Sequence, residues 1–137
     1  MSKYDSFETT LTEEVPLVAA LRAIGYPVEV HAHGAPLFGY HGDERPERAQ
    51  IIIRRQHLDN ASNDIGFARD ANGRFTAILS EYDRNIGFDQ NWLNRVHQRY
   101  KEQRTILMAR QRGYVFRGRE VIQTEKGEQV KLLFGMR

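Results

Sequence analysis

The stretch from Ala49 to Tyr82 constrains the fold of this chain most strongly. It contains three successive segments, at 49–56, 64–69 and 74–82, that are rich in Ile, Phe or Leu and are bounded by Asn, Asp and Gly. Such a pattern is typical of half-buried antiparallel strands. Between the second and third segments, Asn72 and Gly73 tolerate the positive φ angles of a tight hairpin. The sequence therefore predicts a meander in which these two strands pair directly.

Further elements are predicted before this stretch. Residues 6–11 alternate in polarity, as a strand with one wet face does. A helix is predicted to begin after Thr12 as its N-cap and to end at Gly25. A strand at 28–33 would then direct Val28, Val30 and Ala32 inward and place Glu29, His31 and His33 on the opposite face of the sheet.

After the meander, the pattern predicts one long helix and a final hairpin. Asp89 is expected to cap a helix that runs to about Arg112. Two strands at 114–124 and 128–134 should then pair about a turn at 125–127, with a bulge at 117–119.

Helices on one face of a mainly antiparallel sheet bury the apolar residues of these elements most simply. We therefore predict an α+β fold with two helices packed on one face of the sheet, for which a ferredoxin-like variant is one arrangement. The chain has 137 residues, of which 40% are hydrophobic. This size is typical of one domain with one core, so residues 1–137 are expected to form a single domain.

The composition excludes several classes of function. The absence of cysteine excludes disulfide scaffolds, thiolate metal sites and cysteine nucleophiles. No apolar run approaches the ~20 residues of a membrane span, and the first residues do not form a signal peptide. The sequence predicts a soluble cytoplasmic protein with no membrane partner. No cofactor is expected, because no established cofactor motif occurs.

Three histidines are the candidate metal ligands. His31 and His33 are two residues apart on a predicted strand, so their Cβ atoms would lie ~7 Å apart on one face. His41 or Asp43 from the following segment could complete a site. The alternative is a solvated sheet face, because His-x-His is common by chance and no cysteine is present. An enzyme that uses these histidines with nearby carboxylates is one hypothesis, although the sequence favours a protein that is not an enzyme.

The segment 34–48 has three glycines, two prolines and several apolar side chains, including Phe38 and Tyr40. It is predicted to be a surface loop that either binds a partner or closes one end of the core. Asp64 is expected to form an Asx turn or, as the alternative, to act as a base or ligand. Gly66 within a strand predicts a bulge or a close approach of another backbone or a ligand. The predicted partner-binding residues are Phe38, Tyr40, Arg45, Arg54, Arg55, Asn63 and Asp64.

Positive charge is concentrated between Trp92 and Arg119, where eight basic residues accompany a single acid, Glu102. Such a segment could attract phosphate or an acidic partner, or its arginines could simply solvate the outer face of a helix. A nucleic-acid hypothesis, with RNA as the ligand, follows from nearby aromatic residues that could stack on bases. Its candidate residues are Arg95, Arg99, Arg117 and Arg119.

One run of sequence, LFGYHGDERPERAQIIIRRQHLDNASNDIGF at 37–67, precedes DANGRFTAILSEYD, a helix that contains Trp92, and QRGYVF. Together with the N-terminal ALRAIGYPVE, these segments make the chain resemble a cyanobacterial and plastid family, domain of unknown function 1257. The resemblance covers essentially the whole chain. It implies a small α+β domain without assigned catalytic residues. Genes of this family often lie near ATPases of the AAA class, so the resemblance also implies an accessory role beside such a partner.

These observations predict a non-catalytic binding or adaptor module that acts with a protein partner. The expected binding surface is the free face of the sheet, with Glu29, His31, His33 and Arg54, together with the segment 34–48. A homo-oligomer is compatible with such a surface. RNA binding through residues 92–119 is the alternative, and a histidine-based metal-dependent enzyme is the third hypothesis.

Overall fold

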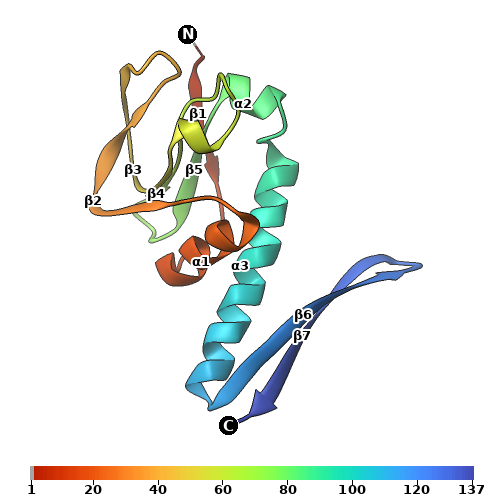
Figure 1. The fold of residues 1–137 in the computed structure, drawn as a ribbon. Helices are drawn as coiled ribbons and strands as arrows, with labels where there is room; N and C mark the ends of the chain where they lie inside the picture. Colours follow the sequence, from red (N-terminus) through yellow and green to blue (C-terminus); the bar gives the residue numbers. More distant parts are fainter. Residues whose placement is uncertain (1) are drawn as a thin grey trace.

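Four strands that follow one another along the chain form most of the main sheet in the computed structural model, which describes residues 2–137 (Figure 1). The sheet has the order β1-β5-β4-β3-β2 and is antiparallel throughout. Its elements are β1 (Tyr4–Glu8), α1 (Glu14–Ile24), β2 (Glu29–Phe38), β3 (Glu44–Ile53), β4 (Ile65–Arg69) and β5 (Phe75–Ser80). The α+β class and the predicted meander are confirmed. The ferredoxin-like arrangement is wrong, because four consecutive strands separate α1 from the next α-helix and β1 lies at the sheet edge beside β5.

The β4–β5 hairpin is the predicted direct pairing, but its turn differs from the expected one. Gly73 N donates to the carbonyl of Asp70 at 3.2 Å. Within the turn only Gly73 has a positive φ, of 80°, and between residues 2 and 137 every residue with a positive φ is a glycine. The Asp70 carboxylate accepts hydrogen bonds from the backbone N–H groups of Asn72 and Arg74. This side chain, rather than a left-handed Asn72, supports the turn.

One face of the sheet carries the main core. A row of side chains, Phe7, Ala77, Phe67 and Ile51, crosses from β1 to β3 on this face. The helices α1 and α3 both cover the row, as predicted, and they also pack on each other. Since every side chain of this row except Phe7 is fully buried, hydrophobic burial here is the main source of stability for the body of the protein.

The opposite face was predicted to be free, and this prediction is wrong. The β2–β3 hairpin curls over it, so that Leu37 and Ala49 pack against the backbone of Gly66. A Cβ atom at Gly66 would lie only 2.7 Å from Cβ of Ala49, so the close approach at this glycine is made by side chains rather than by the backbone or ligand that was expected. A second, smaller cluster results, comprising Tyr4, Leu37, Ala49, Ile52 and Ile78. The inward orientation predicted for Val30 and Ala32 is also wrong, since both side chains are exposed where β2 is bulged.

The segment predicted to be a loop at 34–48 is mostly strand. Only residues 39–43 connect β2 to β3, closed by hydrogen bonds from Gly39 N to the Asp43 carbonyl and from Gly42 N to the Gly39 carbonyl. Two prolines suggested a loop, but Pro36 lies on β2, which is an edge strand. Pro46 lies in the part of β3 that has no pairing with β4. Each proline therefore lies where its strand has a partner on one side only, so the missing N–H group is tolerated.

Element boundaries show three smaller corrections. The first strand ends at Glu8 instead of Leu11, and α1 begins after Glu13, which occupies the N-cap without a side-chain hydrogen bond. The third strand of the meander ends at Ser80 instead of Tyr82. Ser80 caps a short helix that was not predicted, α2 (Glu81–Asn85), by accepting a hydrogen bond from Asp83 N.

The C-terminal part of the chain consists of a long helix and a separate hairpin. Asp89 caps α3 (Gln90–Gln111), as predicted, by accepting a hydrogen bond from Trp92 N. The strands β6 (Tyr114–Thr124) and β7 (Gly127–Met136) form a sheet of their own, with the predicted bulge between Phe116 and Gly118. This hairpin projects away from the main sheet beside α3 (Figure 1). No helix within residues 2–137 combines the length and apolar character that a membrane crossing requires.

Candidate functional site

The seven residues predicted to bind a partner lie together around Asp64. Phe38 ends β2, Tyr40 follows it, and Arg45 is the second residue of the return strand β3. Arg54 and Arg55 follow β3, in and beside a short 3₁₀ helix (Arg55–His57), and Asn63 and Asp64 precede β4. We call this set the Asp64 clamp: Phe38, Tyr40, Arg45, Arg54, Arg55, Asn63 and Asp64.

The Asp64 carboxylate joins the β2–β3 hairpin to the segment that follows β3. Its Oδ2 accepts hydrogen bonds from Phe38 N at 2.7 Å and from Arg54 Nη1 at 2.9 Å, and its Oδ1 accepts one from Arg55 N at 2.7 Å. The Asx turn predicted for this residue is therefore wrong, because the bonds span distant segments. Asp64 is fully buried and both carboxylate oxygens have donors, so the geometry gives it a structural role and leaves no free oxygen for proton abstraction.

A second layer of buried polar groups supports Asn63. Asn63 accepts a hydrogen bond from Tyr40 N at 2.9 Å through Oδ1 and donates to Ser80 Oγ at 2.9 Å through Nδ2. Its backbone N–H donates to Asp83 Oδ2 at 3.0 Å, to which Ser80 Oγ also donates. The sequence analysis missed Ser80 and Asp83; the available signal was a serine three residues before an acid at the end of an apolar strand.

Tyr4 extends this layer to the N-terminal strand. Its hydroxyl donates to the backbone carbonyl of Asp64 at 2.6 Å. Burial, followed by the nearby negative charge of Asp64, raises the pKa of Tyr4 well above its ordinary value, so the phenol remains a donor at all ordinary pH values. The clamp is thus held from β1, β2, β3 and β5 together.

Arginine–aromatic pairs form the outer part of the clamp. The guanidinium of Arg55 lies 5.3 Å from the centre of the Tyr40 ring, and that of Arg54 lies 5.6 Å from the Phe38 ring. Arg54 also bridges Asp64 and Glu29, with 2.9 Å contacts to both carboxylates. The hydrogen bond from Arg54 is the main cause that lowers the pKa of Glu29 to about 2. Tyr40 remains 45% exposed, so the clamp presents a fixed aromatic and cationic surface.

Two hollows flank this surface. The smaller has a volume of about 160 Å³ and lies between the 39–43 turn and Tyr82, with Tyr40, Arg45 and Asn63 among its lining residues. The larger has a volume of about 320 Å³ and is lined by Phe38, Arg54, Arg55 and Asp64 together with Glu29. The volume of the smaller hollow is below the range typical of small-molecule sites, and that of the larger is at the lower end of this range.

The three candidate metal ligands do not assemble into a site. His31 Nε2 lies 2.8 Å from a Glu29 carboxylate oxygen, His33 is exposed, and the His41 ring contacts the Tyr40 ring at a tilt of 59°. Throughout residues 2–137, no three His, Asp or Glu side chains are grouped so that they could hold one ion. The backbone bulge between Val30 and Ala35 disrupts the regular alternation on which the metal hypothesis depended.

The four arginines of the nucleic-acid hypothesis are divided by the structure. Arg95, Arg99 and Arg119 line a hollow of about 380 Å³ between α3 and β6, whose apolar wall includes Tyr26 and Trp92. Arg117 does not line it.

Glu102, the single acid of the basic segment, neutralises part of that charge. Its side chain is only 5% exposed and contacts Arg119 Nε at 2.7 Å and Arg99 Nε at 3.6 Å. Burial by itself would raise the pKa of Glu102, but hydrogen bonds from Arg119 and Gln98 and the adjacent positive charges outweigh it, so the pKa is lowered. Glu102 therefore ties the hairpin to α3, a role that the sequence analysis missed.

The fold and site define an α+β protein in which a buried polar clamp supports an exposed aromatic and cationic surface. A family model described as "Protein of unknown function (DUF1257)" matches residues 20–131. The chain belongs to this family, as its resemblance suggested. A search of curated proteins found no match, and a search of solved structures also found none.

Proposed function

We propose that this protein is a non-catalytic binding or adaptor module that acts with a protein partner through the Asp64 clamp. The single observation that supports this most is that Asp64 and Asn63, both buried, accept hydrogen bonds from the backbone N–H groups of Phe38 and Tyr40, respectively. Tyrosine and arginine are the side chains that most often dominate protein interfaces. A surface that is already ordered loses less entropy on binding.

The kind of partner follows from two considerations. The side chains of Arg55 and Tyr40 favour a partial negative charge and a polar or aromatic contact on the partner. The family resemblance adds an ATPase of the AAA class as the first partner to test.

The test is quantitative affinity purification of the tagged protein from its native cells. We expect a partner in near-stoichiometric amount with the wild type, and its loss with the double variant Tyr40→Ala, Arg55→Ala. Arg74→Ala is the matched control, because Arg74 is exposed and lies away from the clamp at the β4–β5 turn.

Two outcomes would contradict the proposal. A partner that the double variant retains at the wild-type level would remove the clamp from the interface. Stoichiometric nucleic acid, released by salt from the wild type, would instead support the alternative in which the basic segment binds RNA. Circular dichroism and thermal unfolding of the variants establish that a loss of binding is not a loss of folding.

A further inference from the structure

The C-terminal hairpin is rich in apolar residues and yet buries none of them. Not one residue from 113 to 137 is buried. Its large apolar side chains are Tyr114, Val115, Phe116, Val121, Ile122, Val130, Leu132, Leu133, Phe134 and Met136. Isolated two-stranded hairpins are marginally stable in water and gain stability when an apolar face is covered. This hairpin therefore has apolar surface that the rest of the chain does not cover.

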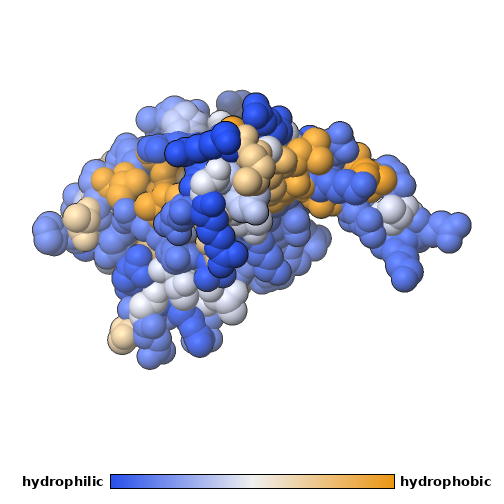
Figure 2. All heavy atoms as spheres, turned by 90° about the horizontal axis from the view of Figure 1, so that it is seen from below, coloured by the Kyte–Doolittle hydropathy of each residue, from blue (hydrophilic) through white to orange (hydrophobic). Residues whose placement is uncertain are grey.

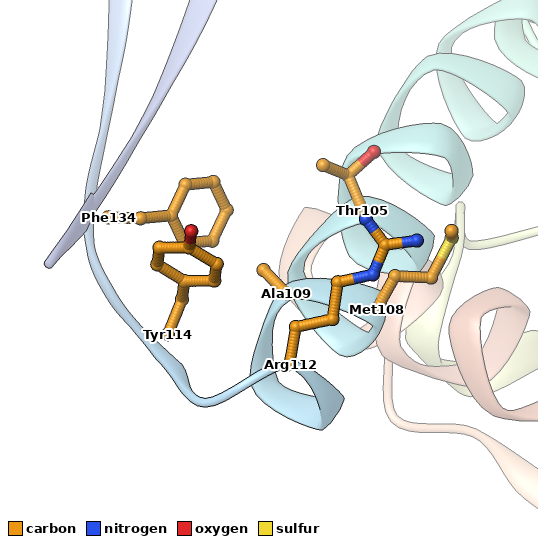
Figure 3. A pocket seen from close by; sticks show the side chains of 6 residues that line it. All are labelled: Thr105, Met108, Ala109, Arg112, Tyr114 and Phe134. Atoms are coloured by element: carbon orange, nitrogen blue, oxygen red, sulfur yellow. The ribbon is translucent and has the colours of Figure 1, made fainter. Parts of the chain in front are cut away.

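The apolar side chains of the hairpin and of α3 form a groove at their junction. It has a volume of about 320 Å³ and is lined by Thr105, Met108, Ala109, Arg112, Tyr114 and Phe134. The rings of Tyr114 and Phe134 stand on the hairpin side and face Ala109 on the last turns of α3 (Figure 3).

The strand register extends this groove along the hairpin. Phe116 is opposite Phe134, and Tyr114 is opposite Met136, so these four side chains share one face. The rings of Phe116 and Phe134 meet edge to face with their centres 5.8 Å apart. The Met136 side chain is 73% exposed. Figure 2 shows a band of apolar atoms that reaches the hairpin between hydrophilic side chains.

Of three arginines without an ion pair within residues 2–137 at the C-terminal end of α3 and in β6, one lines this groove. The side chains of Arg110, Arg112 and Arg117 form no ion pair or hydrogen bond with any residue from 2 to 137, whereas Arg104 and Arg119 are each paired with a glutamate. Arg112 itself lines the groove.

Positive charge is also concentrated in the C-terminal part of the whole chain. Residues 89–137 carry eleven Lys and Arg against five Asp and Glu, whereas residues 1–88 carry nine against thirteen. The groove therefore lies in the positive half of the molecule, where its electrostatic field favours an acidic ligand.

We propose that this groove binds a helix of a protein partner that has apolar side chains along one face and acidic residues beside them. α3 and the hairpin supply two apolar walls, which is the arrangement that receives an amphipathic helix. Arg112 would pair with an acid of the partner at the groove edge. A second copy of this chain is disfavoured as the occupant, because groove-to-groove contact would bring together two positive ends. The proposal concerns a surface separate from the Asp64 clamp and does not rest on the proposed function.

The test begins with a displayed library of random peptides of about 16 residues, long enough for four helical turns. The library is panned against the full-length protein, and the best peptide is then synthesised and its affinity measured by fluorescence anisotropy. We expect selected peptides with apolar residues at helical spacing and with Asp or Glu beside them. Binding should weaken as salt rises.

Point variants assign the binding to the groove. Arg112→Glu and Met108→Glu should each weaken the selected peptide by at least about tenfold, since one reverses the charge at the groove edge and the other places a charge in its apolar wall. Arg74→Glu, which makes the same charge change at the far β4–β5 turn, should leave the affinity unchanged. Circular dichroism of each variant serves as the folding control.

Four results would overturn the proposal. The first is a library that yields no binders, and the second is selection of basic peptides. The third is equal loss of affinity with Arg112→Glu and Arg74→Glu. The fourth is a homodimer, seen by native mass spectrometry, that Met108→Glu dissociates, because it would assign the groove to a second copy of this chain.

Discussion

The Asp64 clamp and the C-terminal hairpin differ in the polarity of their side chains and in how far these side chains are buried. The clamp buries polar side chains, and both oxygens of Asp64 receive hydrogen bonds from its own chain. The hairpin carries apolar side chains and leaves all of them at least partly exposed. A buried polar group that is fully hydrogen-bonded fixes one conformation, whereas exposed apolar surface is a potential source of binding free energy. The chain thus completes one region by itself and leaves the other to be completed by contact with another molecule.

The largest effect is expected from Asp64→Ala. It leaves the partly buried backbone N–H groups of Phe38 and Arg55 without acceptors and Arg54 without its buried partner, so the free energy of unfolding should fall by about 3–5 kcal/mol. Urea denaturation measures this loss. Asp70→Ala is the matched control, because Asp70 also accepts two backbone hydrogen bonds but in an exposed turn, and it should cost about 1 kcal/mol. Equal losses would show that burial does not distinguish the two carboxylates.

The next effect compares two strand glycines, one in β4 just after the clamp and one in the hairpin. Gly66→Ala would place Cβ 2.7 Å from Ala49 Cβ and 3.0 Å from Leu37 Cδ2, and should destabilise the protein by about 1–3 kcal/mol. Gly118→Ala meets no atom within 4 Å in the hairpin, so it should be neutral or slightly stabilising. Thermal unfolding of both variants tests the comparison, and a destabilising Gly118→Ala would mean that the hairpin is more tightly packed than its exposure indicates.

Glu102→Gln tests the connection between α3 and the hairpin. We expect a loss of about 1–2 kcal/mol, less than for a wholly buried ion pair because Arg119 is partly exposed. Because the pKa of Glu102 is lowered in the folded state, its stabilising effect is present above the ordinary carboxyl pKa and is lost as pH falls below it. Hydrogen exchange at neutral pH should become faster in β6 and β7 and stay unchanged in β4. Faster exchange in both sheets would instead indicate global unfolding.

The smallest effect is expected from Glu29→Gln at the outer edge of the clamp. The Glu29 side chain is 46% exposed, so solvent screening limits its contribution to less than about 1 kcal/mol. Its pKa falls from 4.5 to about 2, which means that the contribution is complete above about pH 4.5 and is lost as pH approaches 2. The difference in unfolding free energy between wild type and variant should therefore shrink from pH 6 to pH 3. A difference that grows towards low pH would contradict this assignment.

Much of the fold follows from local patterns in the sequence. The direct pairing of β4 with β5, the Asp89 cap of α3 and the bulge beside Arg117 each depend on residues close together in the chain. The β2–β3 hairpin could not be predicted in the same way. Its prolines are compatible with strands only because of where β2 and β3 lie in the sheet, which local sequence does not reveal.

The candidate site was predictable as a set of residues but not in its chemistry. The aromatic and arginine residues around Asn63 and Asp64 indicated a surface, and they do lie together. The sequence could not show that Asp64 is buried or that its carboxylate bonds to segments before and after it in the chain. Glu102 illustrates the same limit. Its position four residues before the buried Ile106 was a signal of burial, but its pairing with Arg119 depends on where the hairpin lies.

The positions of the four prolines bear on how this protein would aggregate. All four precede Glu47, and one of them, Pro36, interrupts the outer edge of β2. An edge strand with a proline is a poor template for the addition of a strand from another molecule. The two long strands β6 and β7 contain no proline and each has a second edge that is unpaired within residues 2–137. In concentrated solution, misassembly into intermolecular β-sheet would therefore begin at the C-terminal hairpin rather than at the β2 edge of the main sheet.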